Sequence, residues 1–260
     1  MLRTATDVAT IYVIEAKSDA REDIITALKT AASLGVDVVT MSFGSTEFMT
    51  EGEGAGALFN SVGGVTWIPA SGDNFYPSFP ATHPGVVAVG ASSLSSLIPR
   101  VETTWSESGC GESIYVPNLI SKRRWCQHHD QTFRARHFVQ REPELRRRSL
   151  LLALGRLPRS GGYLRERAIF AGIVCLANGS RRHANKPMLS SGTGIAGTQP
   201  SQLQTYLYQL LSNRSDSAAL HDIVSGSGCG TSAAGQGYDL PSGVGSVDAQ
   251  KLIDYLTTAP

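Results

Sequence analysis

The chain has 260 residues, of which 41% are hydrophobic and 17% are charged, and its formal net charge is +1. This composition is typical of a globular protein with a substantial core, and the near-neutral charge gives no global reason to expect nucleic acid or another polyanion as a partner. No apolar run is long enough to span a bilayer, and the polar sequence after Met1 predicts no signal peptide.

The first part of the chain alternates strand-like and helix-like segments. Residues 10–16 are a β-rich run, and a helix follows with Asp19 as N-cap, Glu22 closing a capping box and Gly35 at its end. Strands are predicted at 36–43 and 65–70, with a weaker, glycine-rich helix within 52–62 between them. This order predicts an α/β fold, a parallel sheet with helices on both faces.

Polar residues follow two of the apolar runs between 38 and 90. Ser42 and Gly44 come after the first run, and Asp73 comes after the second. Apolar runs of this kind are typical of buried parallel strands, whose carboxyl ends meet at one edge of the sheet and deliver loops there. We therefore expect Ser42, Gly44 and Asp73 to lie at the same edge.

The character of the sequence changes after residue 117. Twelve of the eighteen arginines fall within 118–169, where apolar periodicity is poor. Regular patterns then return, with an apolar helix at 169–178, a helix at 200–211 and an amphipathic helix at 247–256. We divide the chain into an N-terminal part (1–117), an irregular Arg-rich segment (118–168) and a C-terminal part (169–260).

Four motifs together carry a resemblance to a known family. They are Ser-Phe-Gly-x-x-Glu at 42–47, Ala-Ser-Gly-Asp at 70–73, Pro-Ala-x-x-Pro-x-Val-x-x-Val-Gly at 80–90 and Glu-Thr-Thr-Trp-Ser at 102–106. The combination resembles the sedolisin (serine-carboxyl peptidase) family over roughly 8–116 and 169–257. The resemblance implies a subtilisin-like fold, an acid-active serine endopeptidase with a peptide or protein substrate, a monomer, and an extracellular location.

The resemblance also implies roles for the residues at the sheet edge. Asp73 looks like the family's oxyanion-hole acid, because a protonated carboxyl can donate a hydrogen bond to the developing oxyanion. The backbone of Ser42 and Gly44 would pair with an extended substrate peptide. The alternatives are a turn residue or helix cap for Asp73, and a simple strand exit for Ser42 and Gly44.

The nucleophile and its base are the missing parts of this resemblance. In the family, a Gly-Thr-Ser-x-Ala-x-Pro segment precedes the helix that matches 169–178, whereas 161–168 keeps a glycine pair and lacks the serine. Glu15 and Asp19 have the Glu-x-x-x-Asp spacing of the family's acidic pair, but we interpret them as a strand end and an N-cap. The family places that pair before the strand matching 10–16, so we expect this chain to begin after both the pair and the propeptide.

A second Gly-Thr-Ser occurs at 230–232. No proline or apolar helix follows it, so we interpret Ser232 as a loop serine. We therefore expect no peptide cleavage by this chain, since Asp73 alone cannot form an acyl-enzyme.

The segment 222–245 resembles the family's calcium site. Asp222 and Asp239 would supply carboxylates, and Ile223, Gly235 and Gly237 would supply backbone carbonyls, a mixture of oxygen ligands that suits calcium. The alternative is an Asp- and Gly-rich turn without a metal.

The remaining candidate side chains give weaker signals. The cysteines at 110, 126, 175 and 229 lack metal-ligand spacing, and free buried thiols are the simplest interpretation, although disulfides could form. His83, His183 and His221 show no partner arrangement and are predicted to be surface or loop residues.

Two interpretations of 118–168 stay open. It is either an out-of-frame reading of GC-rich coding sequence, which we favour because the family pattern resumes on both sides, or a genuine basic insertion that binds nucleic acid or an acidic partner. The alternatives to a peptidase are accordingly a non-catalytic calcium-stabilised pseudoenzyme and, more distantly, a basic nucleic-acid-binding protein.

Overall fold

The structure is a computed structural model, and it describes most of the chain on either side of the Arg-rich segment. Predictions that concern 118–163, the glycine pair at 161–162 and Pro200 lie outside the described residues. Within the described ranges, which the next sentence gives, side chains are described for every residue except 55 and 164–167. The described residues are 10–49, 55–60, 64–115, 164–192, 201–212, 219–230 and 232–260.

A parallel pair of strands forms the centre of the fold. β1 (Val38–Met41) and β3 (Thr66–Pro69) run in parallel, with Val38 opposite Thr66 and Met41 opposite Pro69. The third apolar run continues the arrangement, because the amides of Val87 and Val89 donate to the carbonyls of Trp67 and Pro69, each at 2.9 Å. The parallel association of the three runs is therefore confirmed.

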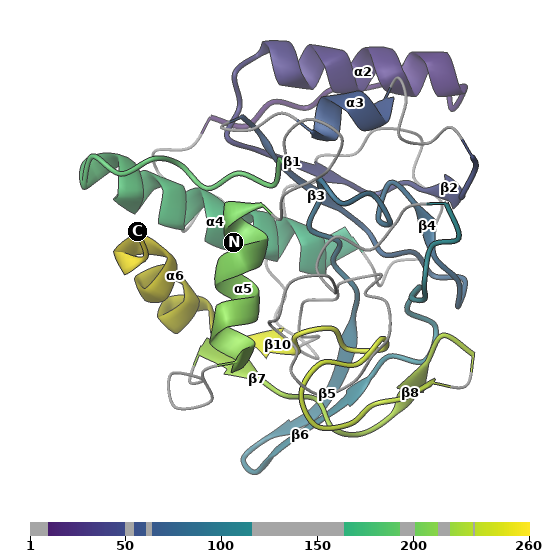
Figure 1. The fold of residues 1–260 in the computed structure, drawn as a ribbon, viewed down its shortest axis with the longest axis vertical. Helices are drawn as coiled ribbons and strands as arrows, with labels where there is room; N and C mark the ends of the chain where they lie inside the picture. The colour runs from purple at the N-terminus through teal and green to yellow at the C-terminus, as the bar shows by residue number, and fades with distance from the viewer. Residues whose placement is uncertain are drawn as a thin grey trace.

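Helices cover both faces of this centre. α2 (Arg21–Ser33) and α3 (Ala55–Phe59) lie on one side, and α4 (Leu164–His183), α5 (Gln202–Ser212) and α6 (Ala249–Thr258) lie on the other (Figure 1). Because side chains alternate along a strand, β1 and β3 contribute to both layers. Val39, Met41 and Trp67 pack with Leu28 and Phe59, whereas Ile68 packs with Phe170, Val174, Leu207 and Leu252.

The other strands form short antiparallel pairs. The hairpin of β5 and β6 and the pair of β8 and β9 lie at the end of the molecule opposite α2 (Figure 1). Among the described residues each sheet consists of two strands, so these strands do not form one continuous subtilisin-like sheet. The pairs are β2 (Ser45–Thr46) with β4 (Ser78–Phe79), β5 (Ser92–Leu97) with β6 (Arg100–Thr104), β7 (Leu220–His221) with β10 (Ser246–Val247), and β8 (Ser227–Gly228) with β9 (Ser232–Ala233).

Two local predictions near the N-terminus are wrong. Residues 10–16 are extended but form no strand, and Tyr12 and Val13 are exposed, because no strand in the described part of the chain pairs with them. The N-cap of α2 is Ala20 rather than Asp19, and no side chain caps the helix. Ser18 organises this turn instead, since its hydroxyl accepts from the amide of Ala20 at 3.2 Å and donates to Asp23 at 2.5 Å.

The helix predictions are confirmed, with shifted ends. α2 ends before Gly35, which has a φ of +64°. α6 begins at Ala249, after the N-cap Asp248, whose carboxylate accepts from the amide of Lys251 at 3.1 Å. α4 begins at Leu164 and so crosses the boundary that we placed between 168 and 169. In the described ranges no helix combines the length and apolar character that crossing a membrane requires.

Candidate functional site

The loops that follow β1 and β3 meet at one edge of the parallel pair. The amide of Ala70 donates to the carbonyl of Met41 at 3.0 Å, so Ser42 and Ser71 leave the strands side by side. A Cβ atom placed on Gly44 would lie 3.2 Å from Ser78 Oγ, and one on Gly72 would lie 3.1 Å from the same oxygen. The structure therefore brings the Ser42–Gly44 segment and the Gly72-Asp73 turn together, with Asp73 exposed to solvent.

Buried hydrogen bonds hold the turn that presents Asp73. The amide of Ser71 donates to the carbonyl of Val89 at 2.9 Å, and the hydroxyl of Ser78 donates to the carbonyl of Ser71 at 3.0 Å. Gly72 then has a φ of +104°, a conformation that favours glycine. Asp73 is thus carried by a backbone whose direction is fixed from the β3 side and the β4 side.

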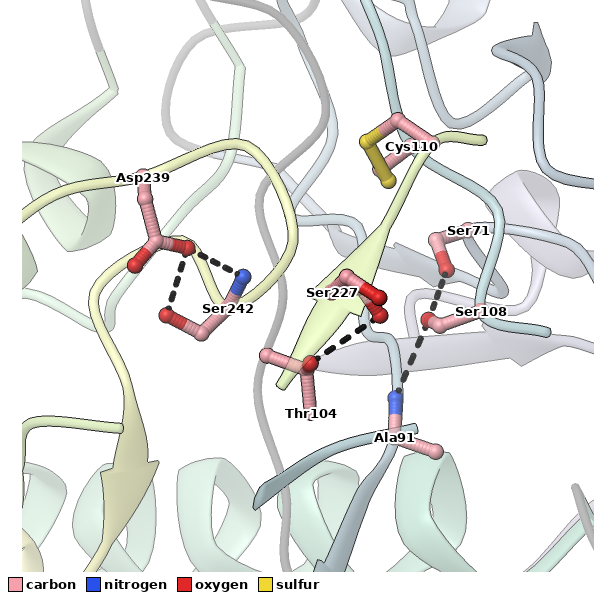
Figure 2. Close-up of a disulfide and its surroundings, with 9 residues drawn as sticks. Ser71, Ala91, Thr104, Ser108, Cys110, Ser227, Asp239 and Ser242 are labelled. Atoms are coloured by element: carbon pink, nitrogen blue, oxygen red, sulfur yellow. Dashed lines mark hydrogen bonds between the residues drawn. A yellow bond between two sulfur atoms is a disulfide. The ribbon is translucent and has the colours of Figure 1, made fainter. Parts of the chain in front are cut away.

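A second segment, 108–111, packs directly on this turn. The hydroxyls of Ser71 and Ser108 are 3.3 Å apart, and Ser108 Oγ also accepts from the amide of Ala91 (Figure 2). The amide of Gly109 donates to the carbonyl of Gly72 at 2.6 Å. A Cβ atom on Gly109 would collide with the carbonyl oxygen of Ser71 and lie 2.9 Å from the carbonyl carbon of Gly72, so only glycine fits here.

Cys110 and Cys229 form a disulfide that joins this segment to the C-terminal part of the chain. The interpretation of free buried thiols is wrong for this pair and holds for Cys175, which is free and half-buried. The pairing could not be assigned from sequence, because the two cysteines are 119 residues apart. Burial raises the pKa of the Cys175 thiol to about 11, and the nearby Asp37 carboxylate adds to the rise, which disfavours the thiolate form.

The predicted calcium residues also lie together. Asp239 accepts from the amides of Gly235 at 2.9 Å and Ser242 at 2.7 Å, and from the Ser242 hydroxyl at 2.8 Å (Figure 2). Asp222 accepts from the amide of Gly237 at 2.8 Å through one carboxylate oxygen. Its other oxygen, Oδ1, is buried and has no hydrogen-bond partner among the described residues.

The two carboxylates influence each other electrostatically. Burial raises the pKa of Asp239, and the negative charge of Asp222 raises it further, while the hydrogen bonds from Gly235 and Ser242 act in the opposite direction. Two neighbouring carboxylates, one of them with an unsatisfied oxygen, are groups that could contribute ligands to a cation. No cluster of three or more His, Cys, Asp or Glu side chains occurs in the described ranges, so further ligands to a cation would be backbone carbonyls.

Comparison with known structures places this arrangement in a fold. The chain superimposes on a Pseudomonas sedolisin, a serine-carboxyl proteinase complexed with pseudo-iodotyrostatin, with a TM-score of 0.63 and 23% identity over 94% of this chain and 72% of that one. The chain has a sedolisin-like fold. No family model matches the sequence, and no curated protein matches it either.

Two further proteases overlap with the sedolisin-like fold more loosely. The prenylagaramide maturation protease PagA has a TM-score of 0.43 and 17% identity, over 93% of this chain and 69% of its own. The self-cleaved protease domain of PatA has a TM-score of 0.40 and 16% identity, over 91% and 68%. The sedolisin-like fold therefore rests on the likeness to the Pseudomonas sedolisin.

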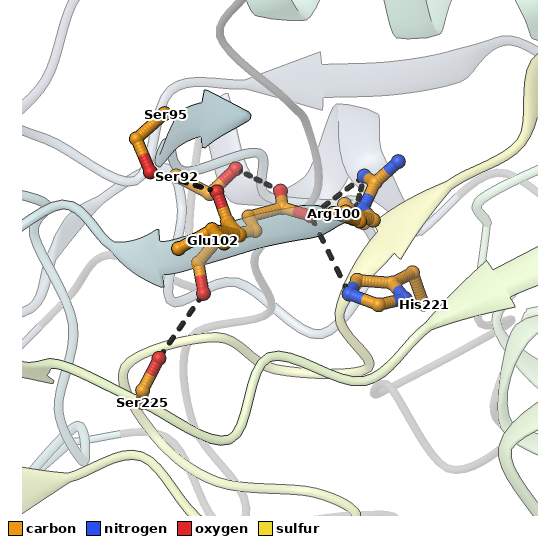
Figure 3. Close-up of polar contacts among 8 residues, drawn as sticks. Ser92, Ser95, Arg100, Glu102, His221 and Ser225 are labelled. Carbon is orange, nitrogen blue, oxygen red and sulfur yellow. Dashed lines mark hydrogen bonds and ion pairs between the residues drawn. The ribbon is translucent and has the colours of Figure 1, made fainter. Parts of the chain in front are cut away.

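A buried carboxylate that the sequence did not reveal, Glu102, contacts the start of the segment that contains Asp222 and Asp239. The Glu102 side chain has no exposed surface and accepts from Arg100, Ser92 and Ser246 (Figure 3). Its backbone carbonyl accepts from the hydroxyl of Ser225 at 3.1 Å. The signal in sequence was the Glu-Thr-Thr-Trp-Ser motif, but nothing local indicated that Glu102 points inward.

Of the three histidines considered in the sequence analysis, one is buried and two are exposed. His183 is exposed, as predicted, and His221 is also exposed but lies 3.9 Å from the Glu102 carboxylate. His83 contradicts the prediction of a surface or loop residue, because it is only 4% exposed. Its ring packs edge-on against that of Phe59, with the two ring centroids 5.2 Å apart. Its Nδ1 accepts from the amide of Gly85 at 3.0 Å, and burial lowers its pKa to about 4.

The nucleophile position of a sedolisin-like fold falls outside the described residues, immediately before α4. Ser232 lies in β9, paired with β8 in the segment between Asp222 and Asp239. Glu15 and Asp19 precede α2 and are exposed. The described part of the candidate site therefore consists of the edge with Ser42, Gly44 and Asp73 and the segment from Asp222 to Asp239.

Proposed function

We propose that this chain has the scaffold of an acid-acting serine-carboxyl endopeptidase that binds extended peptides at the edge formed by Ser42, Gly44 and Asp73. One observation carries the proposal: the backbones of Gly44 and Gly72 both pack against the hydroxyl oxygen of Ser78. A peptide added alongside 42–44 as a strand would have its carbonyl groups beside the exposed Asp73. A protonated Asp73 would donate a hydrogen bond to an oxygen that gains negative charge, which an acidic medium favours.

Hydrolysis also needs a nucleophile and a base. The sequence before α4 lacks the family's serine segment, and Asp73 can stabilise an oxyanion but cannot form an acyl-enzyme. We therefore propose that the 260-residue chain binds peptides without turning them over. This is the pseudoenzyme alternative, and it shares its scaffold with the active family.

Calcium is the cofactor that we propose for the second site. The buried Asp222 Oδ1 without a partner and the coupling of Asp222 with Asp239 support it. Asp222 and Asp239 would hold the ion through carboxylates, and Ile223, Gly235 and Gly237 through backbone carbonyls. A bound cation neutralises the two charges and fixes a glycine-rich loop, so its contribution is to stability and not to bond cleavage.

An extracellular location and a monomeric state complete the proposal. The Cys110–Cys229 disulfide supports the location, because disulfides persist mainly in oxidising compartments.

The test is a hybrid chain that carries the nucleophile and acidic-pair segments of the Pseudomonas sedolisin. Residues 118–168 are replaced by the matching segment of the Pseudomonas sedolisin, and that protein's segment with the acidic pair is added before Thr10. We expect the hybrid to cleave an unfolded protein at about pH 4 and the original chain to leave it intact. Asp73→Ala in the hybrid should lower kcat by about 10²–10³-fold, the usual cost of one oxyanion donor.

One control and two contradicting outcomes complete the test. Asp254→Asn removes an exposed carboxylate on α6 and should leave cleavage unchanged. A folded hybrid that cleaves equally well with and without the Asp73 carboxyl would refute the role of Asp73, and a folded hybrid without any cleavage would refute the peptidase scaffold.

A further inference from the structure

We propose that the Cys110–Cys229 disulfide and Gly109 are positioning elements that couple the calcium segment 222–239 to the turn carrying Asp73. Calcium binding at one end and the geometry of the oxyanion acid at the other would then depend on the same covalent bridge. The inference rests on the calcium assignment of the proposed function and adds a regulatory link to it.

The first half of the link runs from Cys110 to Asp73. Cys110 is fully buried and follows Gly109, whose amide donates to the carbonyl of Gly72 at 2.6 Å. On the other side of Cys110, a Cβ atom on Gly111 would lie 2.8 Å from Pro77 Cδ. The Gly109–Gly111 backbone is thus packed against both ends of the loop that contains Asp73, and a shift of Cys110 displaces that loop.

The second half of the link runs from Cys229 into the calcium segment. Cys229 lies between Asp222 and Gly235 in sequence, and the preceding residue, Gly228, is held between the disulfide and Pro241. A Cβ atom on Gly228 would lie 3.4 Å from Cys110 Sγ and 3.1 Å from Pro241 Cβ. Pro241 is two residues from Asp239. Closure of the carboxylates around a cation therefore presses on the segment that carries Cys229.

The segment is also hydrogen-bonded to β6. Thr104 on β6 donates through its hydroxyl to the carbonyl of Ser227 at 3.1 Å, and its amide donates to the carbonyl of Ser225 at 3.0 Å (Figure 2). The amide of Ala234 donates back to the carbonyl of Gly226 at 3.0 Å. The calcium segment is thus held to β6 by hydrogen bonds and to the backbone beside the Asp73 turn by the disulfide.

Reduction provides the means to break the link. A dithiol reductant transfers two electrons and two protons to the bridge, the Cys110–Cys229 S–S bond breaks to two thiols, and the reductant is oxidised to its own disulfide. If calcium prefers the bridged form by a given factor, then calcium must also disfavour reduction by that same factor.

The experiment measures both sides of this linkage in the full chain. Cys126→Ser and Cys175→Ser are introduced so that only the bridge responds, and the affinity for calcium ion is measured by calorimetry before and after reduction. We expect reduction to weaken binding by about tenfold, within the usual range of coupling between sites. Calcium should then shift the dithiol equilibrium by the same tenfold, about 30 mV for this two-electron couple.

A readout at the far end separates positioning from general stability. Hydrogen exchange at the Gly109 amide should slow on addition of calcium in the bridged chain and stay unchanged by calcium in the reduced chain, with α4 amides as the internal reference. Cys110→Ser/Cys229→Ser should behave as the reduced chain. If that variant does not fold, the redox titration of the bridged chain still decides.

The outcomes separate a failure of the proposed coupling from a failure of the calcium assignment. Equal calcium affinity in the two redox states, with unchanged exchange at Gly109, would overturn the coupling and leave the calcium site in place. No calcium binding in either state would overturn the calcium assignment and the coupling together.

Discussion

The amide of Gly109 donates a hydrogen bond of 2.6 Å to the carbonyl oxygen of Gly72, one residue before the exposed Asp73. This contact joins two segments that are far apart in sequence, the Ser-Gly-Asp turn after β3 and the Ser-Gly-Cys segment after β6. It brings backbone against backbone, so its geometry depends on the absence of a side chain at Gly109.

Gly109→Ala should therefore destabilise the protein by about 2 kcal/mol, because the added methyl group collides with the carbonyl of Ser71 and the backbone must shift. The matched control is Gly179→Ala on the exposed face of α4, where a Cβ atom meets nothing within 4 Å. That change should stabilise the protein by about 0.5–1 kcal/mol, since alanine favours helix. Urea unfolding of both variants checks the prediction, and equal effects at the two glycines would contradict it.

Sequence patterns predicted the parts of this fold that depend on local signals. Both faces of the central strands are covered by the core, which explains why the sequence is apolar at 38–41, 66–69 and 86–89. The positions of the loops at the carboxyl edge followed from this apolar pattern. Residues 10–16 have equally strong strand propensity but gain no partner, and pairing is a property of the whole fold. Propensity alone could not distinguish the two cases.

The candidate site was predictable only where its residues are close in sequence or share a motif. Asp222 and Asp239 share the motif that resembles a calcium site, and the structure places them together, with Asp222 accepting from the amide of Gly237 and Asp239 from that of Gly235. Burial of Glu102 depends on Ser246, and the partner of Cys110 is Cys229, both far along the chain. Such contacts are set by tertiary packing, so no local pattern could indicate them.

His83 should make the folded state sensitive to acid. Burial lowers its folded pKa from the usual 6.5 to about 4, so the unfolded chain takes up a proton first as the pH falls. The stability that neutral His83 contributes is complete above pH 6.5 and is lost as the pH falls through 4, by up to about 3 kcal/mol. His83→Asn keeps an acceptor for the Gly85 amide and cannot protonate, so the free energy of unfolding should fall less between pH 6.5 and 4.

The control for this prediction is His183→Asn at the exposed end of α4, which should keep the pH dependence of the parent chain. Denaturant unfolding at several pH values between 4 and 7 provides the measurement. Parallel pH profiles for the parent chain and His83→Asn would show that His83 does not contribute.

Arg181 should be the most sensitive charged position in the C-terminal part. Its guanidinium is fully buried and donates to the carbonyls of Pro187, Leu256, Ala259 and Pro260, which fixes the end of α6 against α4. Arg181→Met leaves these buried acceptors unsatisfied and should cost about 3 kcal/mol. The neighbouring Arg182 is largely exposed and pairs with Asp37 at 2.9 Å, so Arg182→Met should cost less than about 1 kcal/mol. Thermal unfolding separates the two, and similar losses would contradict the role of Arg181.

The last prediction concerns calcium and pH together. Burial and the charge of Asp222 raise the pKa of Asp239 above its usual 3.8, so without calcium the folded state holds this proton more tightly than the unfolded chain does. That contribution favours folding below pH 3.8 and is lost as the pH rises through the folded pKa.

Calcium reverses this loss, because the cation replaces the proton in balancing the two carboxylates. At a hundredfold excess of calcium over Kd, the folded state should gain about 2.7 kcal/mol, and the gain should be larger at pH 7 than near pH 4. Asp239→Asn should remove most of the gain at pH 7, whereas Asp254→Asn, an equal charge change at an exposed position on α6, should leave it intact. The measurement is the unfolding midpoint with calcium and with chelator at both pH values. A midpoint that calcium does not move at pH 7 would replace the metal site with a turn in which Asp239 only accepts from Gly235 and Ser242.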